Sequence, residues 1–198
     1  MKTRLLLFTL LALATTSASH AAIVWSGPMD VPVPFTFDGV YLNPFTGATA
    51  ATQPADWNTA PWLNPFFGGV DIGSDSLLRP VITGADQVVN LGVGVAISAA
   101  SSFAAGESGS TTHVGAAANQ FHLGTPGYIG FAFEPEDAGP TYYGWAQIAI
   151  SNTGAGTILG WAYDDAPGTA IAAGNPVPEP GTALLLGIGA VAWAARRE

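Results

Sequence analysis

The sequence predicts a mainly β protein, an antiparallel β-sandwich over residues 22–175, flanked by two apolar terminal segments at 1–21 and 176–198. Short strand-like runs alternate with turns rich in Gly, Pro and Asn, and no long amphipathic helical pattern separates them. The composition agrees, because 25 glycines, 15 prolines and only 10% charged residues favour strands and turns over helices. The length of 198 residues suits one domain with terminal appendages.

The clearest strand signals lie in the second half. GYIGFAF (127–133) alternates, and YYGWAQIAI (142–150) and TILGWAYDD (157–165) flank SNTGAG (151–156), which predicts a β-hairpin. TAIAA (169–173) adds one more expected strand. The alternation of the first run places Ile129, Phe131 and Phe133 on one face and Tyr128, Gly130 and Ala132 on the other. Four hairpin aromatics are expected to form cross-strand pairs: Tyr143, Trp145, Trp161 and Tyr163.

The first half of the body is less regular. FTFDGVYLN (35–43) and QVVNLGVGVAISA (87–99) are predicted strands, the second weakened by its glycines. The tetrapeptide Leu-Asn-Pro-Phe occurs at 42–45 and again at 63–66, and both copies are predicted to be Asn-Pro turns. Residues 99–120 are small and polar, which predicts a loop or a short helix.

The N-terminus has the three parts of a secretory signal peptide in order. A short basic region precedes an apolar run at residues 5–14. Ser19 and Ala21 then place small residues at the two positions that a signal peptidase recognises. Cleavage is predicted after Ala21, so the mature chain would begin at Ala22, outside the inner membrane.

The C-terminus joins two prolines, an apolar run and two arginines. Pro178 and Pro180 mark the start of a helix, because proline is excluded from a helix interior. As a helix, residues 181–195 would rise about 22 Å, which is short for a bilayer core of about 30 Å but can cross with lipid thinning. Its apolar side chains surround the helix instead of forming one stripe, so a transmembrane helix is favoured over a core helix. Arg196 and Arg197 would remain cytoplasmic, with the body outside.

This tail resembles the PEP-CTERM sorting signal of Gram-negative bacteria. The residues that carry the resemblance are Val177, Pro178, Glu179, Pro180, Arg196 and Arg197. The resemblance implies that they are recognition residues of a substrate, which an exosortase, a membrane transpeptidase-like protease, processes near the Pro-Glu-Pro element. It also implies an association with exopolysaccharide and biofilm formation, and a membrane anchor that lasts only until cleavage. The second half of the body resembles a body often found before such tails, and that likeness implies no activity.

Charge and cysteine content exclude several partners and chemistries. Residues 22–175 contain one basic residue, Arg79, and twelve acidic residues, for a formal charge of −11. A nucleic-acid partner is not expected, because binding phosphates needs a basic face. The absence of cysteine excludes disulfides, thiolate metal sites and cysteine nucleophiles. Acidic pairs such as Asp164 and Asp165 match no calcium signature and are interpreted as solvated turn residues, so no metal or cofactor is predicted.

No catalytic motif marks the body. His113 and His122 fit no short metal-binding spacing and are interpreted as surface residues. The sequence therefore predicts a non-enzymatic exported protein of the cell surface or extracellular matrix, processed by signal peptidase and exosortase. A secreted carbohydrate-binding module is the alternative, and a secreted hydrolase is a weaker one. Aromatic residues that could bind sugars, although filling of the core is the favoured interpretation, are Trp57, Trp62, Phe66 and Phe67.

Overall fold

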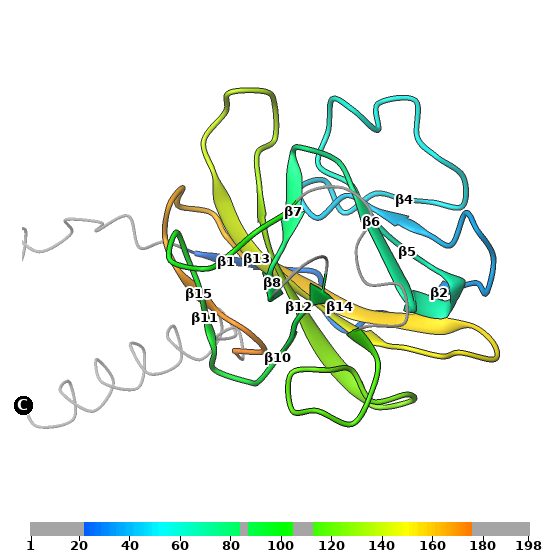
Figure 1. The fold of residues 1–198 in the computed structure, drawn as a ribbon. Helices are drawn as coiled ribbons and strands as arrows, with labels where there is room; N and C mark the ends of the chain where they lie inside the picture. Colours follow the sequence, from blue (N-terminus) through cyan, green and yellow to red (C-terminus); the bar gives the residue numbers. More distant parts are fainter. Residues whose placement is uncertain (1–21, 84–86, 105–112, 176–198) are drawn as a thin grey trace, which may run out of the picture.

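A computed structural model describes residues 22–83, 87–104 and 113–175, and antiparallel sheets dominate these residues (Figure 1). The three longest strands form an antiparallel meander: β12 (Pro126–Phe133), β13 (Tyr142–Ala149) and β14 (Gly156–Asp164). The hairpin predicted around SNTGAG is confirmed as the β13–β14 connection. The prediction of a mainly β, antiparallel protein is confirmed as well.

Short strands complete both edges of this central sheet. β1 (Ile23–Trp25) and β2 (Val31–Val33) pair with opposite ends of β14. On the other edge, β7 (Leu78–Pro80) and β10 (Asn90–Leu91) pair with β12. Each long edge strand is thus covered by two short ones, which limits the unpaired backbone available for association with another chain.

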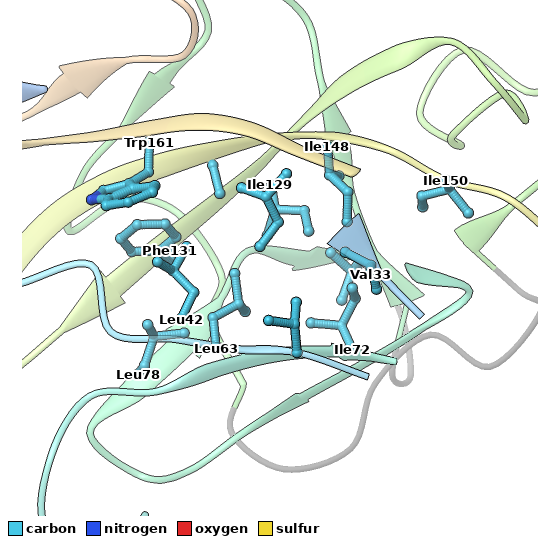
Figure 2. Close-up of a cluster of buried hydrophobic side chains, with 14 of the residues drawn as sticks. Val33, Leu42, Leu63, Ile72, Leu78, Ile129, Phe131, Ile148, Ile150 and Trp161 are labelled. Carbon is cyan, nitrogen blue, oxygen red and sulfur yellow. The ribbon is translucent and has the colours of Figure 1, made fainter. Parts of the chain in front are cut away.

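A four-stranded sheet packs on one face of the central sheet. Its order is β4 (Thr49–Ala50), β3 (Tyr41–Leu42), β5 (Leu63–Phe66) and β6 (Asp71–Ser74), with the 3₁₀ turn η1 (Phe67–Gly69) between the last two. A continuous apolar core lies between the two sheets, as a sandwich requires. Figure 2 shows part of this core, including Val33, Leu42, Leu63, Ile72, Leu78, Ile129, Phe131, Ile148, Ile150 and Trp161.

A second, smaller core covers the opposite face of the central sheet. There β11 (Ala96–Ile97) pairs with β15 (Ile171–Ala172). A further pair, β8 (Ile82–Thr83) with β9 (Gln87–Val88), lies in the connection before β10. The second core combines residues of both layers: Val81, Leu91, Ile97, Ala132, Tyr143, Trp145, Ala162, Ile171 and Ala173.

The predicted two faces of β12 match these two cores. Ile129, Phe131 and Phe133 belong to the first core, whereas Tyr128 and Ala132 belong to or pack against the second. Strict alternation sorts these residues because side chains of a strand point to opposite faces with a period of two. Both faces are buried, so the sequence shows an apolar strand with no polar side.

The expected cross-strand aromatic pairs are confirmed in part. Trp145 meets Tyr128 of β12 at a centroid distance of 5.4 Å, and Tyr163 meets Tyr142 of β13 at 6.2 Å, but at directly opposite positions of β13 and β14 each large ring faces a small residue. In the register, Tyr163 lies opposite Gly144, Trp145 opposite Ala162, and Trp161 opposite Ala146. A Cβ atom at position 144 would lie 2.5 Å from the Phe131 ring, so the neighbouring rings occupy the space that glycine leaves. Large and small residues alternate across the sheet because both faces must reach the density of a packed core.

A bulge in β14 changes which side chains face the first core. The register shifts between Gln147 and Ile148, so that Leu159 is an extra residue in the ladder. Ile158 and Trp161 consequently share the first core, although a strict period of two would separate them. A φ of 156° at Gly160 accompanies the irregularity.

Several expected elements are shorter than predicted or differ in kind. Of 35–43 only Tyr41–Leu42 is a strand, and 87–99 divides into β9, β10 and β11. In 169–173 the strand is limited to Ile171–Ala172. The second Leu-Asn-Pro-Phe copy is strand β5 and not a turn, whereas the first copy ends β3 and continues as a turn.

Two predicted helices lie outside the described residues: the signal-peptide helix in 1–21 and the transmembrane helix at 181–195. Within 22–83, 87–104 and 113–175, no helix has the length and apolar character needed to span a membrane.

Candidate functional site

The predicted processing residues do not fall in the part of the chain that the structure describes. Ser19 and Ala21 precede it, and the sorting residues Val177, Pro178, Glu179, Pro180, Arg196 and Arg197 follow it. The geometry of a candidate site therefore comes from the body.

A hollow lies on the outward face of the four-stranded sheet. Alternation directs Leu42, Leu63 and Ile72 into the first core, so Tyr41 and Asn64 face away from it. The hollow has a volume of about 280 Å³. Its lining residues come from β3, β5, β6, the loop before β3 and the loop between β4 and β5: Phe37, Tyr41, Gln53, Trp57, Asn64, Phe66, Gly73 and Ser74. This set is called the aromatic groove below.

Aromatic rings form the walls of the groove. Tyr41 and Trp57 meet edge to face with ring centroids 5.2 Å apart, and Phe37 meets Phe66 in the same way at 5.9 Å. Phe66 is buried at 6% exposure, whereas Phe37 is 76% exposed. The groove therefore has a fixed aromatic floor and one ring that projects into solvent, an arrangement that can accept the apolar face of a ligand.

Polar contacts hold the two loops that carry these rings. The Asn64 side-chain amide donates hydrogen bonds to the Asp38 carbonyl at 2.8 Å and the Val40 carbonyl at 3.0 Å. Gly39 lies so close to β5 that a Cβ atom there would be 2.2 Å from the Pro65 carbonyl oxygen. The loop before β3 is thus packed directly on the strand that forms the groove floor.

The second loop is organised by Asp56. Its carboxylate accepts a hydrogen bond from the Trp62 indole nitrogen at 3.2 Å, and its carbonyl accepts the backbone N–H groups of Thr59 and Ala60. Trp57, the next residue, is held against Tyr41 by this folded loop. Burial, together with the nearby Asp38 carboxylate, raises the pKa of Tyr41, so its hydroxyl stays protonated at neutral pH and can donate a hydrogen bond.

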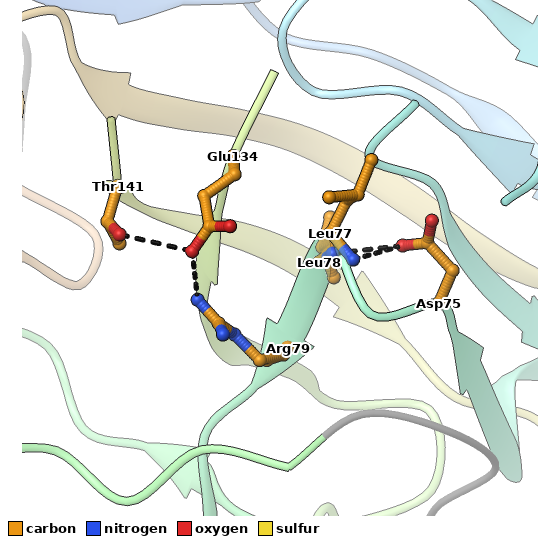
Figure 3. Close-up of polar contacts among 6 residues, drawn as sticks. All are labelled: Asp75, Leu77, Leu78, Arg79, Glu134 and Thr141. Atoms are coloured by element: carbon orange, nitrogen blue, oxygen red, sulfur yellow. Dashed lines mark hydrogen bonds and ion pairs between the residues drawn. The ribbon is translucent and has the colours of Figure 1, made fainter. Parts of the chain in front are cut away.

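The groove lies in an acidic setting. Asp38 and Asp56 adjoin the groove residues Phe37 and Trp57 in the chain, and both are exposed. Arg79 is the only Lys or Arg in residues 22–175. Its guanidinium is 2.6 Å from the Glu134 carboxylate, which also accepts the Thr141 hydroxyl (Figure 3). Arg79 thus acts in a structural ion pair and gives the groove no positive charge.

A second hollow lies beside that ion pair. It has a volume of about 340 Å³ and is lined by Arg79, Ala99, Phe103, Ala132, Thr141 and Tyr143. Phe103 and Tyr143 stack within it at a centroid distance of 5.9 Å. Its charged group is already paired, so we regard the aromatic groove as the better candidate site.

The acidic residues interpreted as solvated turn residues are in part buried. The Asp75 carboxylate accepts the backbone N–H groups of Leu77 and Leu78 at 3.0 and 2.9 Å, which forms the turn between β6 and β7 (Figure 3). Asp164 accepts the N–H of Ala166 at 2.9 Å in the same manner. Both side chains are buried. Burial raises the pKa of Asp75 to about 6, against the opposing effect of its backbone hydrogen bonds.

The surface interpretation of the two histidines is wrong for His113. Its side chain is 0% exposed, and Nε2 lies 3.2 Å from the Gly69 carbonyl oxygen. The carbonyl accepts, so Nε2 carries the proton. Burial lowers the pKa of His113, so the ring is neutral at pH 7 and packs edge to face on Phe121. His122 is exposed, as expected.

The structure separates the four aromatic candidates named from the sequence. Trp57 and Phe66 line the groove, whereas Trp62 is buried outside its lining and Phe67 is half-buried. Sequence reasoning missed Phe37 and Tyr41, because 35–43 was predicted to be one strand. The flanking Pro34 and the pair Asp38-Gly39 are turn signals that could have identified the loop. Among the described residues, no group of three or more His, Asp or Glu side chains is placed to hold a metal ion.

Comparison with known proteins supplies evidence about the C-terminal segment. Residues 176–198 match the family described as the PEP-CTERM protein-sorting motif. No curated protein and no solved structure matches the chain. The resemblance inferred from the tail is therefore confirmed: the chain carries a PEP-CTERM sorting motif at its C-terminus. The motif supports an exported protein that an exosortase processes and that the C-terminal region anchors transiently in the membrane.

Proposed function

We propose that this chain is a non-enzymatic, exported protein that an exosortase delivers to the cell surface or the extracellular polysaccharide matrix. The match of residues 176–198 to the sorting motif carries the proposal. In this scheme, signal peptidase removes residues 1–21 and the helix at 181–195 holds the body outside the inner membrane. Arg196 and Arg197 stay in the cytoplasm until the tail is removed near Pro178–Pro180.

Deletion of the exosortase gene in the producing strain tests the sorting step. In the parent strain the mature chain is expected to lose its tail and leave the membrane fraction, as measured by intact mass and cell fractionation. In the deletion strain the chain should retain residues 181–198 and stay with the membrane. An identical mass and location in both strains would show that the tail is no exosortase substrate.

A tail variant provides a matched test in the parent strain. Glu179→Ala changes the Pro-Glu-Pro element, and Glu136→Ala removes an exposed carboxylate from the body. Only the first change is expected to leave unprocessed chain at the membrane. Equal processing of both variants would remove Glu179 from the recognition residues.

For the activity of the body, the aromatic groove favours carbohydrate binding as a second component of the function. A sugar ring presents an apolar face to aromatic side chains and hydroxyl groups to polar ones, and ligand sites combine such surfaces. In the groove, Phe37 and Trp57 supply the rings, while Gln53 and the protonated Tyr41 hydroxyl supply hydrogen-bonding groups.

The negative charge of the body limits the classes of glycan that the groove can bind. The Asp, Glu, Lys and Arg side chains of the body sum to a formal charge of −11, and its one Lys or Arg, Arg79, is paired with Glu134. A polyanionic chain rich in uronic acids would be repelled, because like charges oppose association. The groove therefore fits a neutral glycan or one with free amino groups.

Binding assays with two tryptophan variants test this activity. Trp57→Ala removes a groove wall, and Trp25→Ala removes a tryptophan that is 43% exposed on β1, away from the groove lining. In affinity electrophoresis with the producer's own exopolysaccharide, chitosan and alginate, the unmodified protein should bind one of the first two and not alginate. We expect Trp57→Ala to weaken binding about tenfold, the size of effect that loss of one aromatic contact has in a ligand site. No binding to any of the three, or equal loss in both variants, would refute the groove as a glycan site.

A further inference from the structure

The first described residue of the body is bound to the end of the central sheet by two hydrogen bonds. The Ala22 nitrogen donates to the Asp165 carboxylate at 2.6 Å, and the Asp165 nitrogen donates to the Ala22 carbonyl at 3.0 Å. These contacts extend the β1–β14 ladder, in which Ile23 lies opposite Asp164. Ala22 is also the residue at which the mature chain is predicted to begin.

Among the residues that the structure describes, no positive side chain pairs with Asp165. The one Lys or Arg of residues 22–175 is Arg79, which is paired with Glu134. The nearest charged neighbour in the chain is the acid Asp164, whose Oδ1 accepts the N–H of Ala166. The Asp165 carboxylate also acts on Tyr163, whose pKa is raised by burial first and by Asp165 second. Within the described part of the chain, this end of β14 therefore carries negative charge that no side-chain cation balances.

We propose that signal-peptide removal creates the missing cation, because it converts the Ala22 nitrogen from an amide into an ammonium group that pairs with Asp165. Water hydrolyses the bond between Ala21 and Ala22, the new carboxylate leaves with the signal peptide, and the Ala22 amine takes up a proton. The inference rests on the proposed export and goes beyond it, since it assigns a structural role to the new N-terminus.

The ion pair would add to the hydrogen bonds that hold a short edge strand. β1 contains three residues, and Val24 and Trp25 in it are exposed. It covers the edge of β14 at Ala162–Asp164, where unpaired backbone groups could pair with another chain. The neutral Ala22 amide already donates a hydrogen bond to the Asp165 carboxylate. A charged ammonium donor at the same position would strengthen that hydrogen bond. The edge of the central sheet is thus closed most firmly only after the signal peptide has been removed.

The composition of the chain makes the N-terminal amine directly measurable. The single lysine is Lys2, within the predicted signal peptide, so the mature chain has no other primary amine. Full-length protein would be exported with its own signal peptide, purified after processing, and its first residue identified by mass spectrometry. An amine-reactive reagent then labels only the N-terminus, and its rate against pH reports the pKa of that amine.

Two variants separate charge from hydrogen bonding. Asp165→Asn keeps an oxygen that can accept the Ala22 donor but removes the charge, and Asp137→Asn changes an exposed acid elsewhere. Near pH 8, close to the usual pKa of an α-amine, the unmodified protein and Asp137→Asn should label about two- to fivefold more slowly than Asp165→Asn, the range that exposed ion pairs produce. The difference should vanish in denaturant and shrink at high salt.

Three results would overturn the proposal. A mature chain that begins at a residue other than Ala22 has no ammonium at this position. Equal labelling rates for the unmodified protein and Asp165→Asn would show that the charge is not felt, and a rate difference that persists in denaturant would show that it does not depend on the fold. None of these results bears on exosortase sorting, which is measured separately from the mass of the C-terminus.

Discussion

The two copies of Leu-Asn-Pro-Phe have the same four residues and different structures. In the first copy, Leu42 is the last residue of β3 and residues 44–46 form a turn. In the second, all of Leu63–Phe66 is strand β5. The two copies even touch, because Leu42 lies opposite Leu63 in the β3–β5 ladder.

The asparagine side chains show how the copies diverge. Asn43 uses its oxygen locally and accepts the backbone N–H groups of Phe45 and Thr46, both at 3.0 Å. Asn64 uses its nitrogen over a long range and donates to the carbonyls of Asp38 and Val40. A side chain that bonds its own turn favours a turn, whereas one that bonds a distant loop leaves the strand extended.

The neighbours of the second copy outweigh its turn signal. Proline is usually restricted to edge strands, yet Pro65 lies in a strand that pairs with both β3 and β6. It lies opposite Ile72 in the β5–β6 ladder, and its carbonyl accepts the Val40 N–H at 3.0 Å. The comparison teaches that the same local preference can be kept or overridden, depending on which partners the rest of the fold supplies.

The largest expected loss of stability comes from adding a side-chain atom at Gly39, in the loop that packs on the second copy. Gly39→Ala would place a Cβ atom 2.2 Å from the Pro65 oxygen at a φ of +55°. We expect a loss of about 4 kcal/mol in the free energy of unfolding, from left-handed strain and overpacking together. The matched control is Gly47→Ala beside the first copy, where φ is +75° but the nearest atom is an ordinary 3.5 Å away, so that strain alone costs about 1–2 kcal/mol. Urea unfolding followed by tryptophan fluorescence measures both, and equal losses would show that the packing of Gly39 on β5 is unimportant.

A change of pH should alter the stability of the fold through Asp75. This residue forms the turn after β6, the strand that pairs with the second copy. The pKa of Asp75 is raised from 3.8 to about 6 in the folded state, so folding favours the protonated form. Its contribution is fully present below about pH 3.8 and is lost as the pH rises through about 6, which amounts to about 3 kcal/mol at 1.36 kcal/mol per pKa unit. The difference in unfolding free energy between pH 3 and pH 7.5 should therefore shift by about that amount in Asp75→Asn, and not in Asp137→Asn. An unchanged pH dependence in Asp75→Asn would contradict the buried environment of this carboxyl.

The smallest expected effects come from the two asparagines themselves. Asn64→Ala leaves two carbonyls without their donor, one of them on the buried Val40, and should cost about 2 kcal/mol. Asn43→Ala removes one oxygen that accepts two hydrogen bonds within its own turn, whose donors Phe45 and Thr46 are exposed and can bond water instead, and should cost about 1 kcal/mol. Urea unfolding measures these losses, and glycan binding supplies a second readout, because only Asn64 lines the groove. If Asn43→Ala weakened binding as much as Asn64→Ala, the copies would not differ in function as they do in structure.

Sequence reasoning succeeded where the deciding contacts are close along the chain. The hairpin of β13 and β14 is specified by two alternating runs around one turn, and the faces of β12 follow from its period of two. It failed where the partners are distant. The loop at 34–40, held by Asn64, and the burial of His113 against Gly69 each depend on a segment far away in the sequence.

The sequence by itself determined the β class and the sorting motif, because alternation is a local property and the tail is a linear signal that a processing enzyme recognises. Only the tertiary structure decided the groove. Its lining comes from three separate stretches, 37–41, 53–57 and 64–74, and the residues within each show no shared pattern. The Ala22–Asp165 contact likewise joins residues at opposite ends of the body, because the fold places β1 beside the end of β14.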